Sequence, residues 1–103
     1  METLRRASPL RITGLIWLDY IVEKLSRKHS VRPEEVKEIL GSAQSVRRVE
    51  KGHRPSEDVY AALGQTDSGR YLIVFFVCKS GGRALILSAR DMTRAERRMY
   101  GER

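Results

Sequence analysis

The hydrophobic residues of this chain follow two different spacings. Over residues 19–40 they recur every three or four positions, which is the period of a helix with one buried face. Over residues 45–90 they alternate with polar residues or form short apolar runs bounded by glycine-bearing turns, which is typical of antiparallel strands. A threonine followed three positions later by a glutamate forms a capping box that begins a last helix at residues 94–100. The pattern predicts an α+β domain.

Two helices are predicted in the first half of the chain. The first covers Asp19–His29, with Asp19 expected as its N-cap. The second begins at Pro33, which suits a first helical position, and ends at Gly41. Its first turn carries two acidic residues, which favour the positive end of the helix dipole. The residues expected to be buried on these helices are Ile21, Val22, Leu25, Val36, Ile39 and Leu40.

Five strands are expected around these helices. They are Ile12–Trp17, Ser45–Val49, Val59–Thr66, Tyr71–Lys79 and Arg83–Arg90. The fourth, Tyr71–Lys79, is apolar on both faces, so it belongs in the middle of a sheet that is covered on both sides. The expected order is β-α-α-β-β-β-β-α: a small antiparallel sheet, two N-terminal helices packed on it and a short C-terminal helix, Arg94–Tyr100.

Length and composition are those of one domain. The chain has 103 residues, of which 41% are hydrophobic, enough to form a core. Residues 1–10 are expected to form a loose arm, and residues 11–103 a single domain. The longest apolar run has eight residues and no signal-peptide pattern is visible, so a cytoplasmic setting is expected. Cys78 is the only cysteine, and His29 and His53 are the only histidines. No metal and no cofactor are therefore expected.

The net charge points to an anionic partner. Lysine and arginine total 20 against 13 acidic residues, a net charge of +7. The two halves of the chain carry +4 (residues 1–52) and +3 (residues 53–103), so the charge belongs to the whole domain. Such a field raises the local concentration of polyanions and suits RNA, DNA or an acidic protein. The alternative is a basic protein whose charge is only solvated.

Basic and aromatic residues stand at the ends of the expected elements. The candidates are Lys28, His29, Arg70, Arg83, Arg90, Arg94, Arg97 and Tyr100. Arg90 ends an apolar strand directly before a helix, where a side chain can be held rigidly. Arg70, Arg90 and Arg97 are expected to converge on one phosphate-sized hollow.

Each candidate also has a purely structural interpretation. Lys28 and His29 could only favour the negative end of a helix dipole. Arg70 could be a solvated edge charge, and Tyr100 could be part of the core. Arg97 could pair with a neighbouring carboxylate, and Arg94 shares one helix face with Arg98, which is typical of solvated residues. Glu96 fits its capping role better than a catalytic one.

Three segments together resemble the BrnT family of bacterial toxins. They are "ALGQTDSGRYLIVFFV", "RALILSAR" and "TRAERRMY", and the likeness extends upstream through "IW" at residues 16–17 and "KHSVRPEEV" at residues 28–36. The resemblance implies a fold related to RelE and ParE toxins, RNA cleavage that stops translation, and neutralisation by a protein antitoxin. It also implies operator DNA binding through the antitoxin and a possible heterotetramer. The matching residues are Lys28, His29, Arg70, Arg90, Glu96, Arg97 and Tyr100.

The chain departs from the family pattern at several positions. A tryptophan–aspartate pair is Trp17-Leu18 here, Ile21 stands where a lysine is expected, and Leu25 replaces an asparagine. The glycine after His29 is a serine, and Val59 replaces an arginine beside a tyrosine. Two polar positions near the expected cleft are thus apolar.

The residues suggest metal-independent attack of a ribose 2′-hydroxyl on the adjacent phosphate. Arg90, helped by Arg70 or Arg97, would stabilise the developing negative charge. His29 would transfer protons, and Tyr100 would stack on a base or donate to the phosphate. Lys28, Arg83 and Arg94 would bind the RNA backbone. Two alternatives stay open: a non-catalytic nucleic-acid binder, and an inactive relative that keeps only its antitoxin interaction.

Overall fold

The computed structural model describes residues 12–42, 45–54 and 57–101, so the expected N-terminal arm lies outside the described residues. The elements are β1 (Gly14–Ile16), α1 (Asp19–His29), α2 (Pro33–Ser42), β2 (Ser45–Glu50), β3 (Val59–Gln65), β4 (Tyr71–Lys79), the 3-10 turn η2 (Ser80–Gly82), β5 (Arg83–Asp91) and α3 (Arg94–Tyr100). The predicted order of helices and strands is confirmed.

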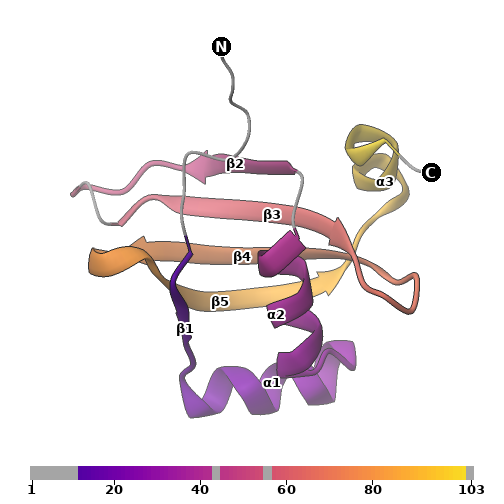
Figure 1. Cartoon of the computed structure of the whole chain (residues 1–103), viewed down its shortest axis with the longest axis horizontal. Coiled ribbons are helices and arrows are strands. Elements are labelled where there is room, and N and C mark those ends of the chain that lie inside the picture. The colour runs from indigo at the N-terminus through magenta and orange to yellow at the C-terminus, as the bar shows by residue number, and fades with distance from the viewer. Residues whose placement is uncertain (1–11, 43–44, 55–56, 102–103) are drawn as a thin grey trace.

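The five strands form one sheet in the order β1-β5-β4-β3-β2, with β4 in the middle as predicted. All neighbouring pairs are antiparallel except β1 and β5, which run parallel. The sequence did not show this parallel pair, because β1 and β5 are far apart along the chain. Figure 1 shows β1 crossing to the outer side of β5 before the chain enters α1.

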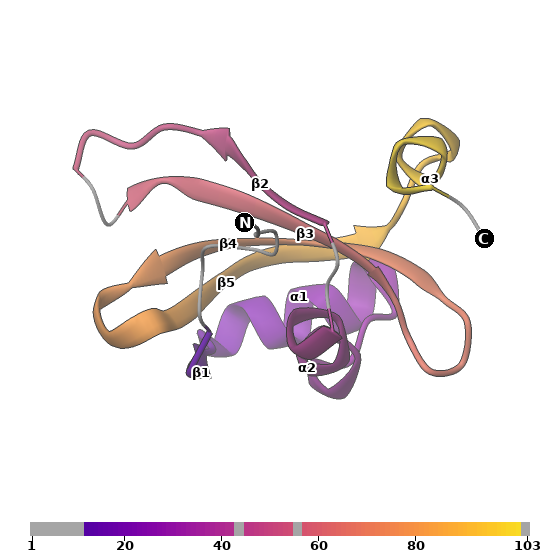
Figure 2. The same ribbon diagram turned by 45° about the horizontal axis from the view of Figure 1, so that its top comes forward.

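The helices lie on opposite faces of the sheet. Figure 2 shows α1 and α2 beneath one face, while α3 lies above the other, at the end where β3 and β5 finish. We call these the helix face and the open face, and we call that end the α3 end. The α3 end also holds the turn between β3 and β4 and the last turn of α1.

The strict alternation of β4 produces a core on each side of the sheet. Leu72, Val74 and Phe76 have no exposed surface and belong to the cluster beneath α1 and α2. Ile73 belongs to a smaller cluster on the open face, with Ala61, Leu63 and Met92, against which Tyr71, Phe75 and Tyr100 pack. Four of the six predicted helix core residues are buried, and Val22 and Leu40 are half-buried.

Most boundaries agree with the sequence pattern, and one cap does not. β4 and α3 have the predicted bounds, and the capping box of Thr93 and Glu96 is present. The prediction of Asp19 as N-cap is wrong, because the N-cap is Leu18, whose side chain makes no capping hydrogen bond. α2 runs one residue past Gly41, which is tolerated because this last turn is exposed. β1 has only three residues.

Candidate functional site

Arg70 ties the two N-terminal helices to the sheet. Its Nη2 donates to the His29 carbonyl oxygen (2.8 Å) and its Nη1 to that of Ser30 (2.7 Å). Nη1 also donates to both carboxylate oxygens of Glu35 (3.1 and 3.3 Å). Nε and Nη2 donate to the two oxygens of Asp91 (2.7 and 3.3 Å). One guanidinium thus joins the end of α1, the first turn of α2 and the end of β5.

The two carboxylates around Arg70 lie in different environments. Glu35 is only 6% exposed and also accepts a hydrogen bond from the Arg32 amide (3.0 Å). Asp91 is exposed, and the hydrogen bond from Arg70 is the main cause that lowers its pKa, with a smaller contribution from the nearby charge of His29. The Asp91 hydrogen bond likewise raises the pKa of Arg70. Arg70 is therefore a structural cross-link and not a solvated edge charge.

The last turn of α1 needs this support. Ser30 is its C-cap and has a left-handed backbone (φ 54°), a conformation that residues with a Cβ adopt at a cost. Its amide donates to the Leu25 carbonyl oxygen, and its own carbonyl accepts from Arg70. The capping hydrogen bonds hold a serine where the family pattern has glycine.

Arg90 forms a second cross-link on the open face. Its two terminal nitrogens donate to the two carboxylate oxygens of Glu96 (2.8 and 2.9 Å), a bidentate pair. Its guanidinium also lies 5.5 Å from the centre of the Phe75 ring. Glu96 Oε1 accepts from the Thr93 amide as well, so the capping residue and the strand arginine fix the start of α3 together. Hydrogen bonds from Arg90 and Thr93 lower the pKa of Glu96 to about 2.

Arg97 and Tyr100 pack on one tyrosine. The Arg97 guanidinium lies 4.4 Å from the centre of the Tyr71 ring, and the rings of Tyr71 and Tyr100 meet edge to face with 6.1 Å between their centres. Both contacts belong to the open face, since Tyr71 packs on the same small cluster as Phe75. Two carboxylates close to Arg97 in the sequence, Glu96 and Asp91, bind Arg90 and Arg70.

A positively charged recess opens beside these residues. It has a volume of about 430 Å³ and is lined by Met92, Arg94, Arg97 and Arg98. Arg94 and Arg98 are exposed, Arg97 is half-buried, and Met92 is 8% exposed. Their exposure agrees with the expected solvated helix face of Arg94 and Arg98, and their position in the lining also allows them to contact a ligand.

The predicted convergence of three arginines is wrong for Arg70. Arg90 and Asp91 are neighbours in β5 and therefore point to opposite faces. Arg70 binds Asp91 and the helix ends, while Arg90 and Arg97 lie against open-face residues. Lys28 and His29, at the end of α1, are at the same end of the sheet as Arg90 but beside Arg70.

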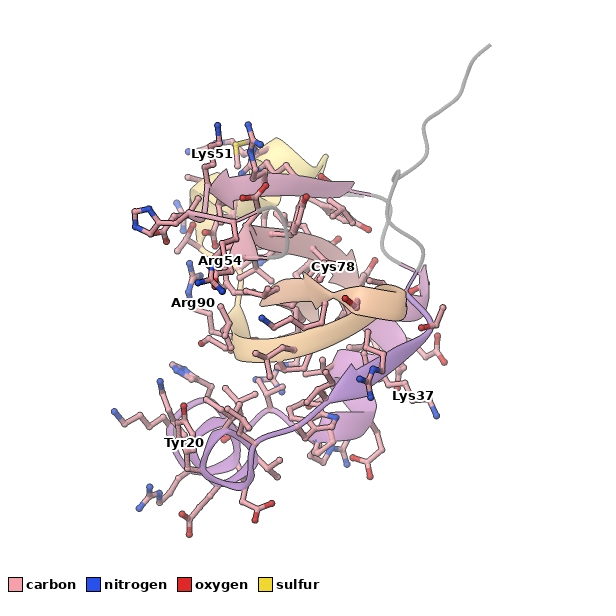
Figure 3. The ribbon with its side chains drawn as sticks, turned by 90° about the vertical axis from the view of Figure 1, so that its left-hand side faces the viewer. Tyr20, Lys37, Lys51, Arg54, Cys78 and Arg90 are labelled. Carbon is pink, nitrogen blue, oxygen red and sulfur yellow. The ribbon has the colours of Figure 1, made fainter. Side chains whose placement is uncertain are left out.

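Arg83 does not join either group. It begins β5 and pairs with Lys79, whereas Arg90 is seven residues later on the same strand. At ~3.3 Å per residue, about 23 Å separates the two along the strand. Figure 3 shows Arg90 on the side opposite Lys37 of α2. Arg83 lies at the other end of β5 from Arg90, and its contact with the RNA backbone stays a prediction.

Two residues were missed by the sequence interpretation. Glu35 was taken as a helix-dipole residue, and Asp91 was placed beyond the strand. One signal for Glu35 existed: it lies four positions before Ile39 and so on the buried face of α2. The sequence pattern does not predict which cation pairs with Glu35, because Arg70 is thirty-five residues away along the chain.

The Glu96 pair makes a testable contribution to acid stability. Because its pKa in the folded protein lies below the ordinary 4.5, its stabilisation is present above pH 4.5 and is lost as the pH falls towards 2. We expect Glu96→Gln to lower the free energy of unfolding at pH 7 by about 2 kcal/mol. Its urea unfolding free energy should also depend less on pH between 5 and 2 than that of the wild type. Glu23→Gln on exposed α1 surface serves as control; equal slopes for all three proteins would contradict the pairing.

The chain matches a family model, described as "Ribonuclease toxin, BrnT, of type II toxin-antitoxin system", over residues 22–96. That is more than two thirds of its length. The chain belongs to the BrnT family. It is therefore a ribonuclease toxin, and the type II system implies a cognate protein antitoxin as its partner. No curated protein sequence matches the chain.

A BrnT crystal structure has the same fold. It is the ribonuclease toxin BrnT of Brucella abortus, with 16% sequence identity and a TM-score of 0.57. The match covers 79% of this chain and 97% of that one. The α+β fold expected from the sequence is confirmed.

Two departures from the family pattern lie in the core of this BrnT chain. Ile21 and Leu25 are 4% and 1% exposed and belong to the cluster between α1 and the sheet. Neither presents a polar group to a ligand. Leu18 is 38% exposed at the start of α1, and Val59 lies at the end of β3 opposite the α3 end.

In the described parts of the chain, no helix could cross a bilayer. The same parts of the chain contain no group of three or more His, Cys, Asp or Glu side chains that could hold a metal ion.

Proposed function

We propose that this BrnT toxin cleaves RNA at the α3 end of the open face. The 2′-hydroxyl of one nucleotide attacks its own 3′-phosphate, the 5′-oxygen of the next nucleotide leaves, and a 2′,3′-cyclic phosphate remains. The observation that carries the proposal is the grouping of Arg90, Arg97 and Tyr100 on one wall beside a basic recess. The substrate supplies its own nucleophile, so the protein needs to position the phosphate, stabilise charge and move protons.

The contacts of Arg90 and Arg97 support a different division of roles from the one expected from the sequence. Both terminal nitrogens of Arg90 are bound by Glu96, so Arg90 positions α3. Arg97 lies one turn from Tyr100 and lines the recess, which suits it to stabilise the negative charge that grows on the phosphate. A guanidinium held on an aromatic ring is preorganised, so little reorganisation is needed when the charge develops. Tyr100 donates to a phosphate oxygen or stacks on a base.

RNA bound at Arg97 must pass around the end of β5 to reach the helix face, where His29 lies beside Arg70. His29 is assigned to proton transfer there. It is the one histidine at the α3 end, since His53 follows β2 at the other end of the sheet. The His29 carbonyl is fixed by Arg70, and its charge lies near enough to Asp91 to affect that carboxyl. Arg70 is thus a positioning residue that acts through His29. Lys28, exposed beside His29, contacts the RNA backbone.

We expect His29→Gln to lower kcat at neutral pH by about a hundredfold, because a positioned acid or base contributes 10²–10⁴ in rate. KM should change little. His53→Gln is the matched control, with the same replacement in an exposed loop, and should retain activity. A pH–rate profile distinguishes the proton-transfer role from a packing role. In the variant, the side of the profile that is due to proton transfer by His29 should be absent. Equal rates for both variants would remove His29 from the mechanism.

The test of the proposed reaction uses the products. Purified toxin and RNA are incubated in EDTA, and the 3′ ends are identified by mass spectrometry. A second RNA carries one 2′-deoxynucleotide at the cleaved position. We expect cyclic phosphate ends from the first RNA and no cut at the deoxy position. Cleavage of the deoxy RNA, or activity only with added metal, would overturn the 2′-hydroxyl mechanism; stable binding without cleavage would favour a non-catalytic RNA binder.

The same wall suits the antitoxin. An acidic antitoxin segment on Arg94, Arg97 and Arg98 would block RNA and offset their mutual repulsion. Family likeness further supports cytoplasmic RNA cleavage that stops translation, a toxin–antitoxin heterotetramer, and operator DNA binding through the antitoxin.

A further inference from the structure

Three of the four residues that line the recess on α3 are arginines. Arg94, Arg97 and Arg98 stand at i, i+3 and i+4, so they are neighbours on one helix face and repel one another. Glu96, the acidic residue of α3, points to Arg90 and to the Thr93 amide, away from this group. Among the residues that the structure describes, the lining contains three arginines and a methionine, and no carboxylate. A concave arrangement of this charge is stabilised by an anion.

The size of the recess fits a nucleotide better than a lone ion. A volume of about 430 Å³ lies in the range of small-molecule sites, roughly 300–1,000 Å³. Met92 closes one side with an apolar surface and is itself held in the small open-face cluster. An apolar floor with cationic walls matches a ribose or base together with its phosphate.

Arg97 connects the recess with the proposed cleavage site. It lines the recess, and its guanidinium lies on the Tyr71 ring that Tyr100 also contacts. Arg94 and Arg98 lie on the exposed side of the recess and contact neither ring by any described interaction. The geometry separates a reactive side, with Arg97 and Tyr100, from an outer side, with Arg94 and Arg98.

We propose that this recess is a subsite for the phosphate and sugar of a nucleotide that flanks the cleaved bond, held by Arg94 and Arg98. The inference rests on the proposed RNA cleavage. It adds a contact to a flanking nucleotide to the contact that Arg97 makes with the reacting phosphate. Because the flanking phosphate keeps its charge throughout the reaction, these two arginines bind substrate and transition state equally. They determine KM and the length of RNA that is recognised, while Arg97 determines kcat.

The test uses the double variant Arg94→Ala/Arg98→Ala and a charge-matched control, Lys37→Ala/Lys51→Ala. The control residues are exposed, and they lie away from α3, on α2 and in the segment after β2. The probe is a fluorescent 2′-deoxy-substituted oligonucleotide that cannot be cleaved, titrated at several salt concentrations. We expect the first variant to bind at least tenfold more weakly, with a salt slope smaller by about 0.7, the value for one lost phosphate contact on a single strand. The control should keep the wild-type slope to within about 0.2.

Steady-state cleavage supplies the second readout. The recess variant should show KM raised about tenfold and kcat within twofold of wild type, and a dinucleotide lacking the flanking phosphate should be cut equally by both proteins. Equal losses of RNA affinity in the two double variants would overturn the subsite. They would show that binding depends on the overall positive charge of the domain and not on the recess. Normal oligonucleotide affinity with lost antitoxin binding would also overturn it and make the recess a protein interface. If the wild type binds the probe with these properties but does not cut RNA, cleavage fails while the subsite stands.

Discussion

Replacement of Arg70 by alanine is expected to lower the free energy of unfolding by about 3 kcal/mol. Glu35, which is 6% exposed, would lose its main cation, and removing one partner of a buried pair costs roughly 3–5 kcal/mol. The Arg70 side chain is 25% exposed, so the lower end applies. The carbonyl oxygens that end α1 would lose their donor as well. For a domain of this size Tm should fall by about 12 °C or more.

Two further variants identify the cause of this loss. Arg70→Lys keeps the charge but cannot reach both carboxylates and both carbonyls, so an intermediate loss is expected. Arg83→Ala removes an exposed arginine of the same sheet and should change stability by less than about 0.5 kcal/mol. Thermal and urea unfolding measure all three. A wild-type Tm for Arg70→Ala would contradict the cross-link. A variant that folds stably but does not cleave RNA would show that Arg70 takes part in the reaction directly.

Arg97→Ala should reduce kcat/KM for RNA by about a hundredfold. The loss of a preorganised charge stabiliser costs roughly 3 kcal/mol in the transition state. The effect should appear in kcat, because the added phosphate charge exists only in the transition state. Single-turnover cleavage at saturating protein isolates this step.

The controls for Arg97 separate charge from fold. Arg97→Lys keeps a positive charge but not two parallel hydrogen bonds, so part of the rate should return. The cation on the aromatic ring alone contributes about 1 kcal/mol, so Tm should fall by about 4 °C or more in Arg97→Ala. A fall in rate that is matched by a large fall in Tm would mean that Arg97 supports the fold, and an unchanged rate would remove it from the site.

Local sequence rules predicted the elements of this fold well. β4 was recognised as the central strand because it is apolar on both faces, and α3 because of its capping box. Such features depend on residues a few positions apart. The prediction of the N-cap of α1 failed because Leu18 takes that position without a side-chain hydrogen bond. Leucine is not a typical capping residue, so the sequence does not indicate it.

The site was less predictable than the fold, because its contacts join distant parts of the chain. The arginines flanking β5 were recognised as a group, but their partners were not. Asp91 continues β5 one residue beyond the predicted end, and in a strand one residue changes the face. That step separates Arg90 on the open face from Arg70, which Asp91 holds on the helix face. Glu35 reaches Arg70 through packing of α2, which periodicity alone does not place.

The central claim is that RNA lies on the open face at the α3 end. The most direct measurement is photo-crosslinking of the toxin to the 2′-deoxy-substituted RNA, with the attached residues identified by mass spectrometry. The account predicts attachment at Tyr71, Met92 and Tyr100, with much weaker crosslinks when Arg94 and Arg98 are both replaced. Attachment chiefly at the opposite end of the sheet, around Val59 and the Lys51–Arg54 loop, would contradict it.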